Sequence, residues 1–321
     1  MDKPQAKISI CIPVYNVEQY IERCARSLFE QTLDCLEYIF IDDGSHDRSV
    51  DILKKTLLDY PERQAWTKIL CHDKNRGVSA TRKEAMNLAQ GNYIIHCDGD
   101  DWVENNMYEK MYQTILETDA DLVYCDFVRD DPKSKNDVVF SQPDAEDFVE
   151  FINLIIKGPM HCSLWNKLYK RTILDHTPID CPDAICMCED FRINVQLLQK
   201  CIKIVHIPLA LYHYTQNPHS LTTSYRGKQS FLSEVDNIHF FERILTAESR
   251  VYLDAYKRRT LFEALLANGM EPSLWSSLWK DTKRRTWRSH YPLKLKLFFY
   301  LACLHYPTAC WLYSKYKKVK K

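Results

Sequence analysis

Short apolar runs alternate with helical patterns along the N-terminal part of the chain. The runs have the length and the β-branched content of buried strands, and they lie at residues 7–14, 36–41, 68–71, 92–97 and 121–127. Between them, apolar residues recur at intervals of three and four positions, which predicts helices over 17–31, 49–58, 78–89 and 104–117. This alternation predicts an α/β fold, with a mostly parallel sheet that has helices on both faces.

The remainder of the chain begins with a less regular pattern and then turns helical. The expected elements are a loop over 129–147, helices at 148–156 and 189–198, a strand at 203–208, and helices from about residue 227. We therefore predict an α/β domain over residues 1–220 and a helical, basic C-terminal region over residues 221–321.

The formal net charge of the 321 residues is zero, but the charges are unevenly distributed. Residues 251–321 contain 15 Lys and Arg against 4 Asp and Glu, a net charge of +11, so residues 1–250 carry −11. A neutral total excludes a uniformly basic protein that binds nucleic acid. The change of sign supports a domain boundary within the chain.

Two acidic turns follow two of the predicted strands. Asp42 and Asp43 come after strand 36–41, and Asp98 and Asp100 come after strand 92–97. In sheets of this kind, ligands bind outside the carboxyl ends of the strands. Asp98 and Asp100 can converge on one Mg²⁺ or Mn²⁺ ion that also binds phosphate oxygens. The alternative is that both turns are ordinary Asp-rich and Gly-rich connections to helices.

The common glycine-rich nucleotide motifs are absent from the sequence. Neither the dinucleotide-binding pattern Gly-x-Gly-x-x-Gly nor the phosphate loop Gly-x-x-x-x-Gly-Lys-Ser/Thr occurs in it. Arg82, early in the predicted helix 78–89, is expected near the acidic turns. Its guanidinium can hold a diphosphate or pair with an Asp, and an exposed or structurally paired arginine is the alternative.

A series of motifs resembles the family 2 glycosyltransferases with the GT-A fold. The motifs are Ile-Ser-Ile-Cys-Ile-Pro-Val-Tyr-Asn at 8–16, Ser-Leu-Phe-Glu-Gln-Thr at 27–32, Phe-Ile-Asp-Asp-Gly-Ser at 40–45, Asn-Arg-Gly-Val-Ser-Ala-Thr-Arg at 75–82, and the segment 91–102. The resemblance covers residues 5 to 128 firmly and extends loosely to about 220. It implies a GT-A nucleotide-sugar-binding fold, a nucleotide-sugar donor that is usually a UDP-sugar, and inverting transfer to an acceptor hydroxyl.

The resemblance also implies roles for individual residues. The residues that it assigns to the nucleotide site are Pro13, Tyr15, Asp43, Arg82 and Asp98. Of these, the first three surround the nucleoside base, and Arg82 lies near the diphosphate. Asp98 and Asp100 match the metal-binding Asp-x-Asp motif, which implies Mn²⁺ or Mg²⁺ as the cofactor. The metal acts as a Lewis acid that neutralises charge on the leaving nucleoside diphosphate.

An inverting transfer also needs a base for the proton of the acceptor hydroxyl. The family often carries this base in a Glu-Asp pair, and we expect Asp190 to be the base, with Glu189 as the second choice. The alternative is that both acids merely favour the first turn of a helix. The segment Trp165-Asn166-Lys167-Leu168-Tyr169 resembles one in many bacterial members, where it either helps to line an acceptor site or forms a half-buried strand.

The C-terminal region contains a long uncharged segment. Residues 297–314 lack Asp, Glu, Lys and Arg and are rich in aromatic residues, but His305 and Pro307 interrupt them. We expect this aromatic, cationic region to lie in the headgroup layer of an anionic membrane rather than to cross it. The alternative is an amphipathic helix pair that packs on the α/β domain. With 13 Cys and no signal-peptide pattern, we expect the protein in the cytoplasm, peripheral on the inner face of the cell membrane.

The leading hypothesis is a metal-dependent hexosyl- or N-acetylhexosaminyl-transferase for a glycan or lipid-linked acceptor, in the synthesis of a capsule, O-antigen or exopolysaccharide. One alternative is a sugar nucleotidyltransferase, which is expected to begin with a glycine-rich loop and a basic residue that residues 13–18 lack. Another alternative is a non-catalytic scaffold associated with the membrane. The products separate the two enzymes, because transfer releases the nucleoside diphosphate and the nucleotidyltransferase exchanges pyrophosphate.

Overall fold

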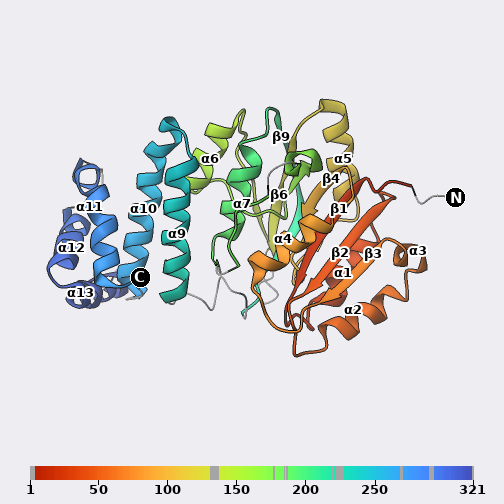
Figure 1. Ribbon diagram of the computed structural model, residues 1–321, viewed down its shortest axis with the longest axis horizontal. Helices are drawn as coiled ribbons and strands as arrows, with labels where there is room; N and C mark the ends of the chain where they lie inside the picture. The colour runs from red at the N-terminus through yellow and green to blue at the C-terminus, as the bar shows by residue number, and fades with distance from the viewer. Residues whose placement is uncertain are drawn as a thin grey trace. The chain divides into compact units, whose positions relative to one another are not determined.

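The computed structural model describes residues 4–130, 137–175, 178–183, 185, 187–218, 220, 228–267, 270–288 and 293–319 (Figure 1). The chain divides into two compact units. The first, here called the sheet unit, consists of Met1–Ile155 and Pro159–Pro218. The second, the helical unit, consists of Ile156–Gly158 and His219–Lys321.

Four parallel strands form the first half of the sheet, in the order β3-β2-β1-β4. They are β1 (Ile8–Val14), β2 (Leu36–Asp42), β3 (Thr67–Cys71) and β4 (Tyr93–His96). β1 is apolar almost throughout and lies between two parallel neighbours, with Ile10 opposite Tyr38 on one side and Ile95 on the other. A strand that is buried on both faces needs a nearly continuous apolar run, which is why it was visible in the sequence.

The helices between these strands are also where the sequence predicts them. They are α1 (Ile21–Phe29), α2 (Ser49–Leu57), α4 (Val78–Leu88) and α5 (Met107–Thr118), together with a short unpredicted helix α3 (Pro61–Gln64). Each of the longer helices begins and ends within a few residues of its predicted bounds.

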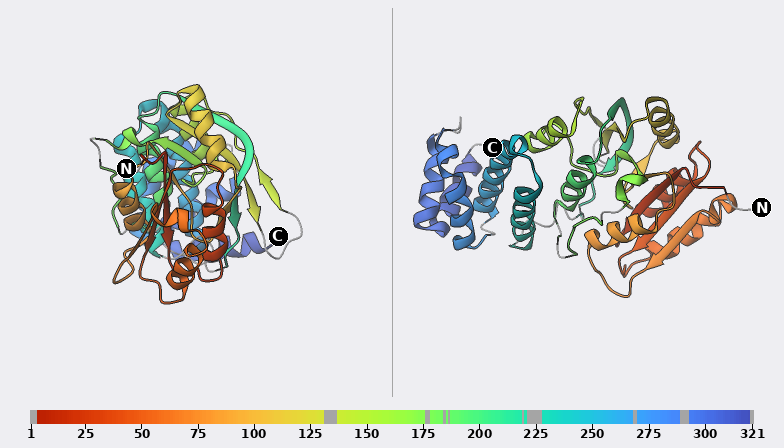
Figure 2. Two further views of the ribbon diagram at one scale, coloured as in Figure 1. Left: turned by 90° about the vertical axis from the view of Figure 1, so that its right-hand side faces the viewer. Right: turned by 45° about the horizontal axis from the view of Figure 1, so that its top comes forward.

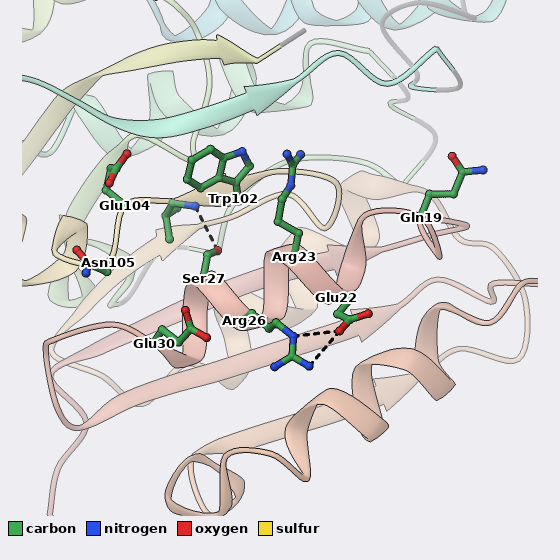
Figure 3. A pocket seen from close by; sticks show the side chains of 10 residues that line it. Gln19, Glu22, Arg23, Arg26, Ser27, Glu30, Trp102, Glu104 and Asn105 are labelled. Atoms are coloured by element: carbon green, nitrogen blue, oxygen red, sulfur yellow. Dashed lines mark hydrogen bonds and ion pairs between the residues drawn. The ribbon is translucent and has the colours of Figure 1, made fainter. Parts of the chain in front are cut away.

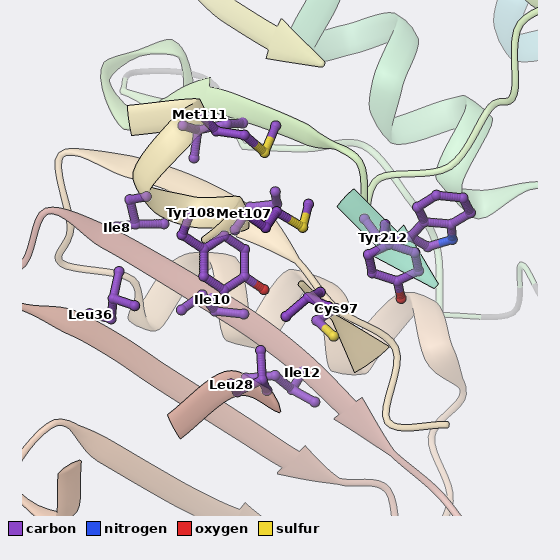
Figure 4. Close-up of a cluster of buried hydrophobic side chains, with 14 of the residues drawn as sticks. Ile8, Ile10, Ile12, Leu28, Leu36, Cys97, Met107, Tyr108, Met111 and Tyr212 are labelled. Carbon is purple, nitrogen blue, oxygen red and sulfur yellow. The ribbon is translucent and has the colours of Figure 1, made fainter. Parts of the chain in front are cut away.

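The core of the sheet unit lies between the sheet and the helices α1 and α5 (Figure 4). Ile8, Ile10 and Ile12 point to this face of β1 and pack with Leu28 of α1 and Met111 of α5. Because side chains alternate along a strand, the residues between them point to the opposite face, where α4 contacts β1 and β2. Helices on both faces of an α/β sheet are thereby confirmed.

The second half of the sheet is mixed, a feature that the sequence pattern does not reveal. β8 (Lys167–Lys170) lies antiparallel between β4 and β6 (Leu122–Asp130). β9 (Ile204–Thr215) pairs parallel with β6, and β5 (Trp102–Val103) pairs antiparallel with β9. Between these strands lie the helices α6 (Phe148–Lys157) and α7 (Glu189–Leu198) and the 3₁₀ turn η1 (Arg171–Leu174).

Two predictions about this half are wrong in part. The stretch 129–147 does not simply loop out, because β7 (Val138–Phe140) pairs antiparallel with β6; residues 131–136 lie outside the described residues. The strand predicted at 203–208 continues to Thr215. A register shift between Cys125 and Phe127 of the partner strand β6 lets the pairing go on beyond the expected end.

The helical unit contains α9 (Lys228–Ile244), α10 (Ala247–Ala267), α11 (Pro272–Arg288), α12 (Leu293–Leu304) and α13 (Tyr306–Val319). Successive helices pack on one another, and α13 returns to α10 (Figure 2). Among the described residues, none of the helices is both long enough and apolar enough to cross a membrane.

The aromatic segment 297–314 divides into α12 and α13 at His305. Its residues Phe299, Tyr306 and Tyr313 are buried, and the Phe299 ring lies 5.5 Å from that of the fully buried Trp275. These three side chains therefore do not face a membrane, because they lie in the core of the helical unit, whereas Trp311 of the same segment is 56% exposed. Membrane association of the segment as a whole stays a prediction.

Candidate active site

The carboxyl ends of β1, β2 and β4 meet at one edge of the sheet, where the predicted site residues follow them. The backbone N–H of Asp43 donates to Val14 O at 2.9 Å, and that of Cys97 donates to Cys11 O at 3.1 Å. These bonds hold the ends of the three strands side by side. Tyr15 and Asp43 therefore lie at neighbouring strand ends, and Asp98 follows the next strand across.

The turn after β4 is held close to β1 by Gly99. A Cβ atom on this residue would lie 2.9 Å from the carbonyl oxygen of Pro13, closer than real Cβ contacts come. Glycine is therefore required where the acidic turn passes the end of β1. This close approach places Pro13 directly against the turn that carries Asp98 and Asp100.

The three carboxylates of the turn have different partners. Asp101 is buried and accepts hydrogen bonds from the Tyr212 hydroxyl at 2.6 Å and from Thr215 N at 2.8 Å. Asp100 Oδ2 accepts one from Asn217 Nδ2 at 2.9 Å. Asp101 thus anchors the turn to β9, while Asp98 and Asp100 are only half-buried.

Burial and a neighbouring charge act together on the Asp100 carboxyl. Burial, followed by the charge of Asp98, raises the pKa of Asp100 to about 6. A divalent cation would remove this repulsion. In the described part of the chain, no three His, Cys, Asp or Glu side chains converge as a complete metal site. Asp98 and Asp100, two partly exposed carboxylates of one turn, are the kind of ligands used by an ion that takes one or two carboxylates from the protein and its other ligands from substrate phosphates and water.

Arg82 of α4 connects the acidic turn to the start of α7. Its Nη2 lies 2.9 Å from Asp98 Oδ1, and its Nε lies 3.4 Å from Glu189 Oε1. The side chain is 6% exposed, and among the described residues Nε and Nη1 have no hydrogen-bond acceptor. The predicted pairing with an Asp is present, and the pairing with Glu189 was not foreseen.

Glu189 and Asp190 form the first turn of α7, directly after Cys188, which has a left-handed backbone with φ of 59°. Burial, followed by the charge of Asp190, raises the pKa of Glu189 to about 7. Burial also raises the pKa of Asp190, whose Oδ2 lies 3.4 Å from the thiol of Cys162. Glu189 is buried and paired with Arg82, whereas Asp190 is partly exposed and also accepts a hydrogen bond from Phe191 N at 2.7 Å.

Residues of the segment 165–169 and of β9 hold the acidic turn and the loop before α7 through contacts that the sequence did not predict. The Trp165 ring stacks on that of Tyr212 at 4.2 Å, and the Tyr212 hydroxyl accepts from Asp98 N at 3.1 Å while donating to Asp101. The buried Lys167 donates to Ser163 O at 2.7 Å, which holds the loop that carries Cys162. Burial lowers the pKa of Lys167 to about 8.

Asp43, predicted to contact a nucleoside base, is buried and organises the loop 72–77. Its carboxylate accepts from Arg76 N and Gly77 N, both at 2.8 Å, and contacts His72 Nδ1 at 2.7 Å. Burial disfavours the charged ring, but hydrogen bonds to Asp43 and Glu84 outweigh burial and raise the pKa of His72. Tyr15, directly after the end of β1, is 44% exposed.

A surface pocket of about 710 Å³ lies along α1 and the segment at β5 (Figure 3). Arg23 and Arg26 line it, but they are paired, Arg23 with Asp130 at 2.8 Å and Arg26 with Glu22 at 3.0 Å. The lining residues include none of the predicted site residues. We therefore place the candidate active site at the acidic turn and the start of α7, not in this pocket.

The chain matches known proteins in sequence. Residues 9–191, more than half of the chain, match the family described as Glycosyl transferase family 2, and the chain belongs to this family. The uncharacterized glycosyltransferase EpsJ of Bacillus subtilis (strain 168) is 29% identical over 223 residues, which are 67% of this chain and 62% of that protein. The match thus spans less than two thirds of the length of this relative.

Solved structures resemble the fold. One is S. aureus TarS 1–349 in complex with UDP-GlcNAc, with a TM-score of 0.65 and 16% identity over 98% of this chain and 92% of that one. Another is the mannosyltransferase PcManGT from Pyrobaculum calidifontis in complex with GDP-Man and Mn²⁺, with a TM-score of 0.56 and 14% identity over 98% and 88%. The predicted GT-A fold with C-terminal helices is confirmed.

Proposed function

We propose that this chain is an inverting glycosyltransferase that moves a sugar from a UDP-sugar to an acceptor hydroxyl. The observation that carries the proposal is the pair of contacts from Arg82, to Asp98 at 2.9 Å and to Glu189 at 3.4 Å. One buried guanidinium thereby joins the acidic turn, which is suited to a metal and a diphosphate, to the helix that carries the candidate base.

In this mechanism Asp190 accepts the proton of the acceptor hydroxyl as its oxygen attacks the anomeric carbon. A base is most effective when its pKa lies near the working pH, and the raised pKa of Asp190 supports this role. Mn²⁺ or Mg²⁺, held by Asp98 and Asp100, would neutralise part of the charge on the leaving diphosphate. Arg82 adds a second positive charge beside Asp98.

On the donor side, we propose that Pro13, Tyr15 and Asp43 surround the nucleoside base. Their positions at the ends of adjacent strands support this assignment, and the exposed Tyr15 ring offers a surface for stacking. The structure of TarS with UDP-GlcNAc supports a UDP-sugar, and that of PcManGT with Mn²⁺ supports the metal. We propose a glycan or lipid-linked acceptor in cell-surface polysaccharide synthesis, used at the inner face of the cell membrane.

The test is to incubate the purified chain with a panel of UDP-hexoses and UDP-N-acetylhexosamines and to measure UDP release with and without Mn²⁺. We expect one donor to give metal-dependent release. Asp100→Asn and Asp190→Asn should each abolish it, and only Asp100→Asn should weaken Mn²⁺-dependent UDP binding. Asp51→Asn, on the exposed face of α2, is the matched control and should behave as the wild type.

Two outcomes would contradict the proposal. Exchange of pyrophosphate into the donor, without release of UDP, would indicate a nucleotidyltransferase. Donor turnover that survives Asp190→Asn would remove this residue from the mechanism as the base, whatever the donor is.

A further inference from the structure

Helices α12 and α13 expose a row of large apolar side chains. On α12 the exposed leucines are Leu293, Leu297 and Leu304, of which Leu304 is 83% exposed. With the partly exposed Leu301 between them, they recur at intervals of four, four and three residues, which places them on one side of the helix. The opposite side carries Phe299 and Ala302, which are buried.

The neighbouring helix also exposes large apolar side chains. α13 packs against α12 and exposes Trp311 and Leu312, while its residues Tyr306, Ala309 and Tyr313 are buried. We call the exposed set of Leu293, Leu297, Leu301, Leu304, Trp311 and Leu312 the leucine face. Single exposed apolar residues are common, but several large ones on two helices that pack together indicate a binding surface.

The sequence that forms α12 and α13 carries charge of one sign. After Asp281 the sequence has no acidic residue, whereas residues 293–321 contain seven lysines. Lys294 lies exposed on α12, and Lys315 of α13 is placed over the Trp311 ring, 3.9 Å from its centroid. A partner must therefore be apolar where it meets the leucines and negatively charged around them.

We propose that the leucine face docks on an anionic lipid surface, with α12 and α13 lying in the plane of the interface. Exposed leucine and tryptophan side chains with lysines beside them are the residue types that hold a helix in the interface of an anionic membrane. A 12-residue helix is about 18 Å long, too short for a hydrocarbon core of about 30 Å. A second copy that met this face symmetrically would bring lysines against lysines, which disfavours a dimer here.

This inference adds a docking surface to the proposed function at the membrane, but its test needs no substrate. The full chain is mixed with vesicles of phosphatidylcholine alone or with added phosphatidylglycerol, and flotation separates bound from free protein. The variant Leu297→Glu/Leu304→Glu places charges on the leucine face. Its matched control is Leu58→Glu/Ile202→Glu, which changes two apolar residues of the sheet unit that are 71% and 91% exposed, against 53% and 83% for Leu297 and Leu304.

We expect the wild type and the control to float with the anionic vesicles. Both should be released at high salt, because salt shortens the distance over which charges attract. The affinity of the Leu297→Glu/Leu304→Glu variant for anionic vesicles should be lower by at least about tenfold, because the transfer of two leucine side chains from water into lipid is lost. All three proteins should unfold at the same temperature, because the changed side chains are exposed.

Equal vesicle binding by the leucine variant and the wild type would overturn the proposal. A second outcome would also overturn it: the wild type does not bind vesicles and is a dimer by light scattering, and Leu297→Glu/Leu304→Glu dissociates this dimer. The leucine face would then bind a second copy of the chain. A membrane result of either kind leaves the UDP-release assay unaffected, so the docking surface and the glycosyltransferase activity stand or fall separately.

Discussion

The buried guanidinium of Arg82 provides a quantitative test of how the site is held together. Arg82→Met removes a positive charge whose side chain is 6% exposed and leaves the half-buried Asp98 and the buried Glu189 without it. Removing one partner of a buried ion pair costs about 3–5 kcal/mol, because the remaining charge is not compensated. We expect the free energy of unfolding at pH 8, measured by urea denaturation, to fall by about this amount.

The loss should depend on pH in a defined direction. The pKa of Glu189 is already raised to about 7 in the folded chain, and it should rise further without Arg82. A carboxylic acid with a raised pKa binds its proton more tightly in the folded state than in the unfolded state. Stability from this group is therefore present at low pH and lost as the pH rises through the folded pKa. Arg82→Met should consequently cost less at pH 5 than at pH 8.

A double-mutant cycle isolates the interaction. Glu189→Gln in the Arg82→Met background removes one uncompensated charge and should recover part of the loss at pH 8, with a coupling of about 1–3 kcal/mol. Arg76→Met is the control, since Arg76 is 44% exposed and its ion pair with Glu84 should contribute about 1 kcal/mol or less. A loss for Arg82→Met no larger than for Arg76→Met, or no recovery in the double variant, would refute the reasoning.

Three further predictions concern separate parts of the chain. Tyr212→Phe removes the hydroxyl between Asp98 N and Asp101, and urea denaturation should show a loss of about 1–3 kcal/mol; an unchanged midpoint would contradict the anchoring role. Asp190→Asn should abolish sugar transfer while calorimetry finds unchanged UDP affinity, and weaker UDP binding would assign the residue to the donor site instead. Trp275→Ala should destabilise the helical unit by about 3–5 kcal/mol in thermal unfolding, since the side chain is fully buried; an unaltered transition would show that this core contributes little.

Much of the sheet unit was predictable because its signals are local. β1 and β2 are continuous apolar runs, and the helices after them repeat apolar residues at helical spacing. The acids after β2 and β4 could be placed at one edge, because parallel strands joined by helices end on the same side. The family resemblance added the expected roles of these acids, which periodicity cannot supply.

The residues that hold the candidate site in place were harder to predict from the sequence. Tyr212 lies in the continuation of β9 past its expected end, and its partner Asp101 is 111 residues away in the chain. The segment that contains Lys167 was compatible with a half-buried strand, and nothing in the sequence indicates that this lysine is fully buried. In the structure its Nζ donates a hydrogen bond to Ser163 O. His72 gave no signal beyond its residue type.

The sequence by itself determined the α/β alternation, the family, the acidic turns and the basic C-terminal region. Periodicity, turn composition and charge depend only on residues that are close together in the chain. The tertiary structure decided which strand lies beside β4, which acid pairs with Arg82, and which side of α12 is buried. These outcomes depend on contacts between residues far apart in the chain. The C-terminal segment illustrates the difference: its composition indicated an apolar, cationic surface, but packing buried Phe299 and Tyr306 beside Trp275 and left several leucines and Trp311 exposed.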